Sequence, residues 1–167
     1  EDVRPLLNKE KIIALAEMMN FPGVIYRDPD VLAKILAARQ QKKPIDGHAP
    51  GLRGPELYAY VSTGIQSDHE CTTAREAKDK LAAGMHIMIR QGTGAKNLQA
   101  LLEAVNERTA RRMMWCTDDR HPHDLIKEGH IDSIVREAIQ SGLDPILAIQ
   151  MATINPAEYF RLDHMGA

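Results

Sequence analysis

The sequence predicts an α/β fold in which parallel strands alternate with helices. Short apolar runs alternate with amphipathic stretches along most of the 167 residues, which is the pattern of βα units. Signals for the start and end of helices follow the apolar runs, and ionisable residues stand where the runs end. Together these observations favour a single domain built on one parallel sheet.

The first two βα units combine short strands with well-marked helices. Residues 12–18 form an apolar segment, which predicts the first strand. The Asp-Pro pair at 28–29 then supplies an N-cap and a first-turn proline for a helix that runs to about Arg39. Residues 44–48 predict a very short second strand, and residues 55–61 predict a short helix after it.

The third unit has the clearest helix signals. Residues 65–69 predict the end of the third strand. Thr73 and Glu76 have the spacing of a capping box, and Gly84 stands where the helix should end. Residues 85–90 are apolar enough to form a fourth strand that is buried on both faces.

The last third of the chain completes the pattern. A glycine-containing loop at 92–94 and a helix at 97–105 follow the fourth strand. Residues 113–117 predict the fifth strand, and two helices, at 131–140 and 144–153, close the chain.

Five strands cannot close an eight-stranded barrel. Either the sheet is open and doubly wound, or the chain lacks the first strands of a barrel. The chain begins at Glu1 with neither an initiator Met nor a targeting leader. We therefore expect a piece of a longer protein, with residues 1–167 forming one incomplete domain.

Composition excludes several classes of partner. The chain has 21 Lys and Arg against 23 Asp and Glu, a net charge of -2, without the positive excess that binding to phosphate backbones requires. Nucleic acid is therefore not expected as a partner. Its apolar runs are far shorter than the roughly 20 residues that cross a bilayer, so no membrane is expected either. Cys71 and Cys116 form no CxxC pair, which favours a reducing cytoplasm.

Ionisable residues gather at the predicted strand ends, where the catalytic groups of βα barrels lie. They are Glu17, Asp46, His48, Asp68, His69, Glu70, Arg90, Asp118, Asp119 and His121. A mixed shell of imidazoles and carboxylates suits a divalent zinc, manganese or iron ion that generates hydroxide from water. The residues alone leave a plainer interpretation open, in which Glu17 is a solvated carboxylate and the Asp pair at 118–119 caps a turn.

Several long motifs carry a specific resemblance. EMMNFPGV, IDGHAPGL, SDHECTT and CTDDRHP, which begin at residues 17, 45, 67 and 116, look like successive motifs of bacterial and archaeal adenine deaminases. The match continues through EGHID and AIQMATINPAE near the end of the chain. Long motifs in the correct order are more specific than one short match. The chain therefore resembles the adenine deaminase family of the amidohydrolase superfamily over almost its whole length.

This resemblance implies a (β/α)8 TIM-type amidohydrolase barrel, of which the chain covers about strands 4 to 8 with their helices. It also implies a binuclear divalent metal centre, with manganese or iron as the metals and zinc as an alternative. Glu17 would be the bridging carboxylate of strand four, and His48 and His69 the ligands of strands five and six. Asp118 would end strand eight, where it contacts a metal and takes the proton from the attacking water.

The resemblance also suggests residues for catalysis and substrate binding. Glu70, Asp119 and His121 are candidates for proton transfer or purine contacts, with Glu70 donating to a ring nitrogen when it is protonated. Arg90 and Asp68 are candidates for substrate binding.

The chain departs from the family pattern in three respects. The His-x-His pair of strand one has no counterpart, so part of one metal site is missing. Gln91 and Thr93 stand where we expect Glu and Ser. The small β domain that flanks the barrel in this family is also not represented.

The implied reaction is hydrolytic deamination of adenine to hypoxanthine and ammonia, by an enzyme expected to be cytoplasmic and homo-oligomeric at full length. One alternative is an amidohydrolase of the hydantoinase or dihydroorotase type that acts on a cyclic amide, because metal ligands alone do not select a substrate. The motif at 67–73 argues against it. The other alternative is a catalytically incomplete fragment, because a five-stranded sheet has two open edges.

Overall fold

Strands and helices alternate through the part of the chain that the structure describes. The structure is a computed structural model that describes residues 3–165, so Glu1 lies outside it. The strands are β1 (Leu15–Met18), β2 (Ile45–Gly47), β3 (Ser67–Asp68), β4 (His86–Arg90) and β5 (Met113–Cys116). The α-helices are α1 (Val3–Leu7), α2 (Phe21–Ile25), α3 (Pro29–Gln40), α4 (Gly54–Ser62), α5 (Ala74–Ala82), α6 (Leu98–Leu101), α7 (Pro122–Lys127), α8 (Ile131–Gln140), α9 (Pro145–Gln150) and α10 (Ile154–Tyr159).

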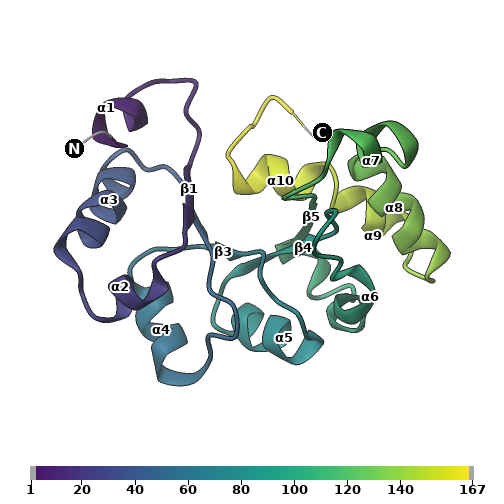
Figure 1. Cartoon of the computed structure of the whole chain (residues 1–167), viewed down its shortest axis with the longest axis horizontal. Coiled ribbons are helices and arrows are strands. Elements are labelled where there is room, and N and C mark those ends of the chain that lie inside the picture. The colour runs from purple at the N-terminus through teal and green to yellow at the C-terminus, as the bar shows by residue number, and fades with distance from the viewer. Residues whose placement is uncertain (1–2, 166–167) are drawn as a thin grey trace.

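All paired strands are parallel and follow one another in chain order. β1 pairs with β2, β3 with β4, and β4 with β5. A hydrogen bond from the Gln66 amide to the Ile45 carbonyl, at 3.0 Å, joins β2 to the chain entering β3. Figure 1 shows β1, β3, β4 and β5 following one another across the molecule, with α3, α4, α5 and α6 in an arc around their outer side. This order does not reverse as in a doubly wound sheet, so it favours a segment of a barrel.

The predicted starts of α3 and α5 are confirmed by their N-cap hydrogen bonds. The Asp28 carboxylate accepts hydrogen bonds from the backbone amides at 30 and 31 and caps α3. The Thr73 hydroxyl accepts from the Glu76 amide at 3.3 Å and caps α5. The capping box is only half formed, however, because the Glu76 carboxylate turns toward Lys80 and the Gly51 amide instead.

The ends of two predicted helices differ from the structure. The helix predicted at 97–105 is α6 followed by a 3-10 turn at Leu102–Ala104. The helix predicted at 144–153 ends at Gln150, and α10 begins four residues later. Pro156 accounts for this break, because a proline is tolerated in the first turn of α10 but would disrupt the interior of one long helix. Helices α1, α2, α7 and α10 were not predicted.

The two faces of β4 and β5 pack against different layers. Ile87 and Trp115 belong to the main core, together with residues of α5, α6 and α8. Met88 and Met114 lie on the opposite face and pack with Tyr159 of α10. The prediction that β4 is buried on both faces is therefore confirmed, because its three central residues are all buried. Within residues 3–165, no helix is both long and apolar enough to span a membrane.

Candidate metal centre

Three predicted metal ligands converge at the ends of the first three strands. Glu17 lies near the end of β1, and His48 and His69 directly follow β2 and β3. Glu17 Oε2 lies 2.9 Å from His48 Nδ1 and 3.1 Å from His69 Nε2. One ligand atom from each residue lies within 4.8 Å of the others. Two imidazole nitrogens therefore face the same carboxylate oxygen, an arrangement that a shared cation would also favour.

Close contacts between neighbouring strands position this cluster. A Cβ on Gly47 would collide with the Ser67 carbonyl oxygen, so glycine allows β2 and β3 to approach each other. The buried Tyr60 hydroxyl accepts a hydrogen bond from the His48 amide at 3.1 Å and donates to the Met18 carbonyl at 3.0 Å. These bonds fix the ends of β1 and β2 beside each other. No feature of the sequence indicates this role of Tyr60.

A second charged group adjoins the first at the ends of β4 and β5. Arg90 pairs with Glu70 and donates to Asp118 Oδ2 at 2.9 Å. Glu70 Oε1 also lies 3.7 Å from His48 Nδ1 and 3.5 Å from His69 Nε2. Glu70 is therefore shared between the histidines and Arg90. Ligand atoms of His69, Glu70 and Asp118 lie within 4.8 Å of one another, so these residues could hold a second ion.

Charge and backbone conformation set this second group apart. Burial opposes the charge of Arg90, but its hydrogen bond to Asp118 and the nearby Glu70 charge outweigh burial and raise the pKa of the guanidinium. The guanidinium therefore remains a cation between the two carboxylates. Asp118 has a φ of 51°, in the left-handed region that is costly for residues with a side chain and occurs often at functional sites.

Asp68 is not brought into this cluster. Its carboxylate is fully buried and accepts hydrogen bonds from Lys80 Nζ at 3.0 Å and from the Ala49 amide at 2.8 Å. A carboxylate held in this way is not presented to a substrate. Lys80 was missed by the sequence analysis, although its spacing of four residues from Glu76 on one helix was a usable signal.

Asp119 and His121 lie in the loop after β5 and contact the loop after β4. The Asp119 carboxylate rests against Gly92 and accepts from the Gly94 amide at 3.3 Å. The His121 amide donates to the Thr93 hydroxyl at 2.9 Å, and its side chain is exposed. These contacts hold the two loops together, and neither side chain belongs to a group of converging ligands in the described range.

Asp46 lies on the face of the sheet that α10 covers, and it belongs to neither group of converging ligands in the described residues. It accepts hydrogen bonds from the Tyr159 hydroxyl at 2.6 Å and from the Ser67 hydroxyl at 3.0 Å. Burial raises the pKa of the Asp46 carboxyl, and these two hydrogen bonds partly offset the rise. Asp46 thereby ties α10 to β2 and β3.

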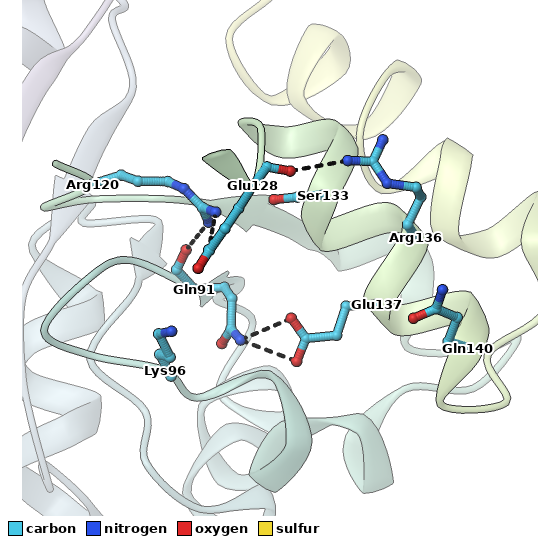
Figure 2. Close-up of a pocket in the computed structure, with 8 residues that line it drawn as sticks. All are labelled: Gln91, Lys96, Arg120, Glu128, Ser133, Arg136, Glu137 and Gln140. Carbon is cyan, nitrogen blue, oxygen red and sulfur yellow. Dashed lines mark hydrogen bonds and ion pairs between the residues drawn. The ribbon is translucent and has the colours of Figure 1, made fainter. Parts of the chain in front are cut away.

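A polar pocket lies between the loop after β4 and helix α8, apart from the ligand cluster. Its lining residues are Gln91, Lys96, Arg120, Glu128, Ser133, Arg136, Glu137 and Gln140. Figure 2 shows the Gln91 amide facing the Glu137 carboxylate, with its nitrogen 3.1 Å and 3.0 Å from the two oxygens. A Glu at position 91 would place two carboxylates in contact, which gives a physical reason for glutamine at this position.

Comparison with known proteins gives the family. A model described as the amidohydrolase family matches residues 2–167. The chain belongs to the amidohydrolase family. A crystal structure of β-aspartyl dipeptidase from Fervidobacterium islandicum AW-1 has a TM-score of 0.68 and 13% sequence identity. It is similar over 98% of this chain and 52% of that one, which supports the amidohydrolase fold.

Several curated relatives of this amidohydrolase chain carry the name adenine deaminase. The protein from Desulfatibacillum aliphaticivorans is 60% identical over 99% of this chain. The proteins from Thermosipho africanus and Clostridium acetobutylicum are 55% and 47% identical over the whole chain. In each case the chain spans only 29% of the length of the relative.

Gln91→Glu should destabilise the chain at neutral pH. The new carboxylate would face Glu137 in a partly buried site, which should lower the free energy of unfolding by roughly 1 to 3 kcal/mol. A proton shared by the two carboxylates relieves the repulsion, so the loss should shrink as the pH falls. Urea unfolding at several pH values measures this effect.

The matched control for this change is Gln99→Glu, which adds the same charge at an exposed position 3.5 Å from a Glu137 oxygen. Solvent should screen that charge and leave the free energy of unfolding nearly unchanged. Equal losses in the two variants would contradict the role assigned to Gln91.

Proposed function

We propose that this chain is part of the catalytic barrel of an adenine deaminase, which hydrolyses adenine to hypoxanthine and ammonia. The observation that carries the proposal is the convergence of Glu17, His48 and His69 at one edge of a parallel sheet. Relatives at 47% to 60% identity are named adenine deaminase, which supports adenine as the substrate in preference to a cyclic amide. A role in purine salvage follows from that substrate.

The residues present fit a divalent metal centre. Two imidazole nitrogens and a carboxylate oxygen form a donor set that suits manganese, iron or zinc. We propose a binuclear centre of manganese or iron, with zinc as the alternative, held by Glu17, His48, His69 and Asp118. When bound, the ions would supply a nucleophile at neutral pH by lowering the pKa of water.

The remaining chemistry is assigned to residues at the ends of β3, β4 and β5. Asp118 would accept the proton of the attacking water, and Glu70 would donate a proton to the purine ring. Arg90 would orient the carboxylates of Glu70 and Asp118, since it donates hydrogen bonds to both. We also assign Arg90 a contact with the substrate. We assign Asp119 and His121 to holding the neighbouring loops, because their contacts lie there.

The chain is proposed to contribute about strands 4 to 8 of the barrel, as β1 to β5. Each outer strand pairs on one side only in the described range, which leaves both edges of the row open to further strands. The share of 29% of each relative supports the same division. Two free cysteines, Cys71 and Cys116, fit the proposed cytoplasmic location.

Glu17→Gln should remove metal and activity together in the longer protein. The substitution keeps the shape of the side chain but removes the charge that a bridging ligand requires. Metal content by elemental analysis and ammonia release from adenine should therefore fall in parallel. Glu56→Gln on the exposed face of α4 is the matched control and should change neither quantity. Normal metal content and normal turnover in Glu17→Gln would mean that Glu17 is an ordinary solvated carboxylate and not a ligand.

Asp118→Asn and Glu70→Gln should separate a metal ligand from a proton donor. Each should lower the turnover number by about 10² to 10⁴, because each removes an acid or a base. Asp118→Asn should also lose metal, whereas Glu70→Gln should stay loaded. Turnover and metal content of both variants decide this. Because Glu70 lies within reach of the same ion as His69 and Asp118, metal loss in Glu70→Gln would make it a ligand and would overturn its assigned role.

A further inference from the structure

A buried ionic network lies beneath the two loops that carry the histidine ligands. It consists of Asp68, Glu76 and Lys80, whose side chains are 0%, 7% and 0% exposed. Lys80 Nζ donates to the Ala49 carbonyl at 2.7 Å, to Glu76 Oε1 at 2.7 Å and to Asp68 Oδ2 at 3.0 Å. Three acceptors match the three N–H groups of the ammonium.

The two carboxylates of this network reach the backbone beside the predicted ligands. Asp68 accepts hydrogen bonds from the Ala49 amide at 2.8 Å and from the Glu70 amide at 3.0 Å. Ala49 directly follows His48, and Glu70 directly follows His69. Asp68 therefore bonds at the same time to the residues that come after both histidines.

Glu76 adds hydrogen bonds further along each loop, and we call the bonds of Asp68 and Glu76 to the two loops the brace. Its Oε1 accepts from the Gly51 amide at 2.8 Å, and its Oε2 accepts from the Thr72 amide at 3.3 Å. Two carboxylates thus hold four backbone amides in two loops, and both carboxylates pair with the single ammonium of Lys80. The loops come from different βα units, so no local hydrogen bond within one loop could fix their separation.

Stability alone is a poor explanation for this arrangement. Burying charged groups is costly, and replacing a buried ion pair by well-packed apolar side chains often leaves stability unchanged or improved. Burial opposes the charge of Lys80, but Asp68 and the bonds to Glu76 outweigh it and raise the pKa of the ammonium, which stays charged. The network fixes the positions of four backbone amides in the two loops, which an apolar core would not do.

We propose that Lys80, with Asp68 and Glu76, is a positioning group that holds His48 and His69 at the separation which a metal ion requires. This inference rests on the proposed function, because a metal centre is the feature that needs this separation. Outer-shell groups that orient metal ligands commonly change metal affinity by about 10 to 100-fold when they are removed.

The test compares Glu76→Gln and Lys80→Met with Leu101→Ala in the longer protein. Glu76→Gln keeps the shape of the side chain and leaves one acceptor in place, so it remains informative if Lys80→Met does not fold. Leu101 is fully buried in the core around β4 and β5, and its apolar side chain takes no part in the hydrogen bonds of the network, so its substitution supplies a matched loss of stability. Cobalt(II) affinity, the visible spectrum of the cobalt-loaded protein and urea unfolding are measured for each.

We expect Glu76→Gln to weaken cobalt binding by about 10-fold or more and to change the visible spectrum. Leu101→Ala should lose stability while the folded protein binds cobalt as the wild type does. Wild-type affinity and spectrum in the folded Glu76→Gln protein would overturn the positioning role.

Two further readouts separate this inference from the proposed function. If the wild-type protein binds cobalt but releases no ammonia from adenine, the proposed substrate fails while the metal measurements still decide the role of Lys80. If the wild-type protein binds no cobalt, the metal function fails. The imidazole NMR signals of His48 and His69 in the metal-free protein then decide: signals that move in Glu76→Gln but not in Leu101→Ala support the brace, and unmoved signals reject it.

Discussion

β2 and β3 approach each other so closely at Gly47 that no side chain fits between that residue and the Ser67 carbonyl. This contact sets the spacing of two parallel strands, and therefore the spacing of the loops that begin at their carboxyl ends. His48 and His69 open those loops, with ring centroids 5.3 Å apart. The metal centre that we propose depends on this separation, because both histidines must reach the same ion.

Charge is distributed around the strand ends in two linked groups. Glu17 faces the two imidazoles, and Arg90 faces Glu70 and Asp118. Glu70 belongs to both groups because one of its oxygens lies between the histidines and the guanidinium. Below them, the buried Lys80 ammonium pairs with the carboxylates of Asp68 and Glu76, which belong to neither group. A carboxylate is assigned as a metal ligand or as part of the brace by the groups that it faces, and not by the motif in which it stands.

The sequence was sufficient for features that depend on neighbouring residues. The starts of α3 and α5 depend on Asp28 and Thr73, whose side chains cap the next turn, so both could be predicted. The strand ends could be predicted from the polar residues that follow each apolar run, and the parallel fold then places Glu17, His48 and His69 at one edge of the sheet. The family resemblance added their roles.

The features that sequence reasoning missed depend on partners far along the chain. Asp68 stands in the same motif as His69, yet its side chain turns to Lys80 and to the Ala49 amide, 19 residues away in sequence. Gln91 stands where the family resemblance leads us to expect Glu, and its amide donates to Glu137, 46 residues away. No local pattern reports such contacts, since they form only after the strands and helices have packed.

We propose that the chain holds one part of a metal site whose other ligands come from outside it. Ammonia release from adenine, by the chain alone and mixed with a separately made segment that supplies the missing strands, tests this most directly. With manganese, iron or zinc added, we expect the mixture to turn over and the chain alone not to reach an enzymatic rate, because under-coordinated ions bind weakly. An enzymatic rate from the chain alone would contradict the claim, and another residue, with His121 the first candidate, would then have to replace the missing histidine pair.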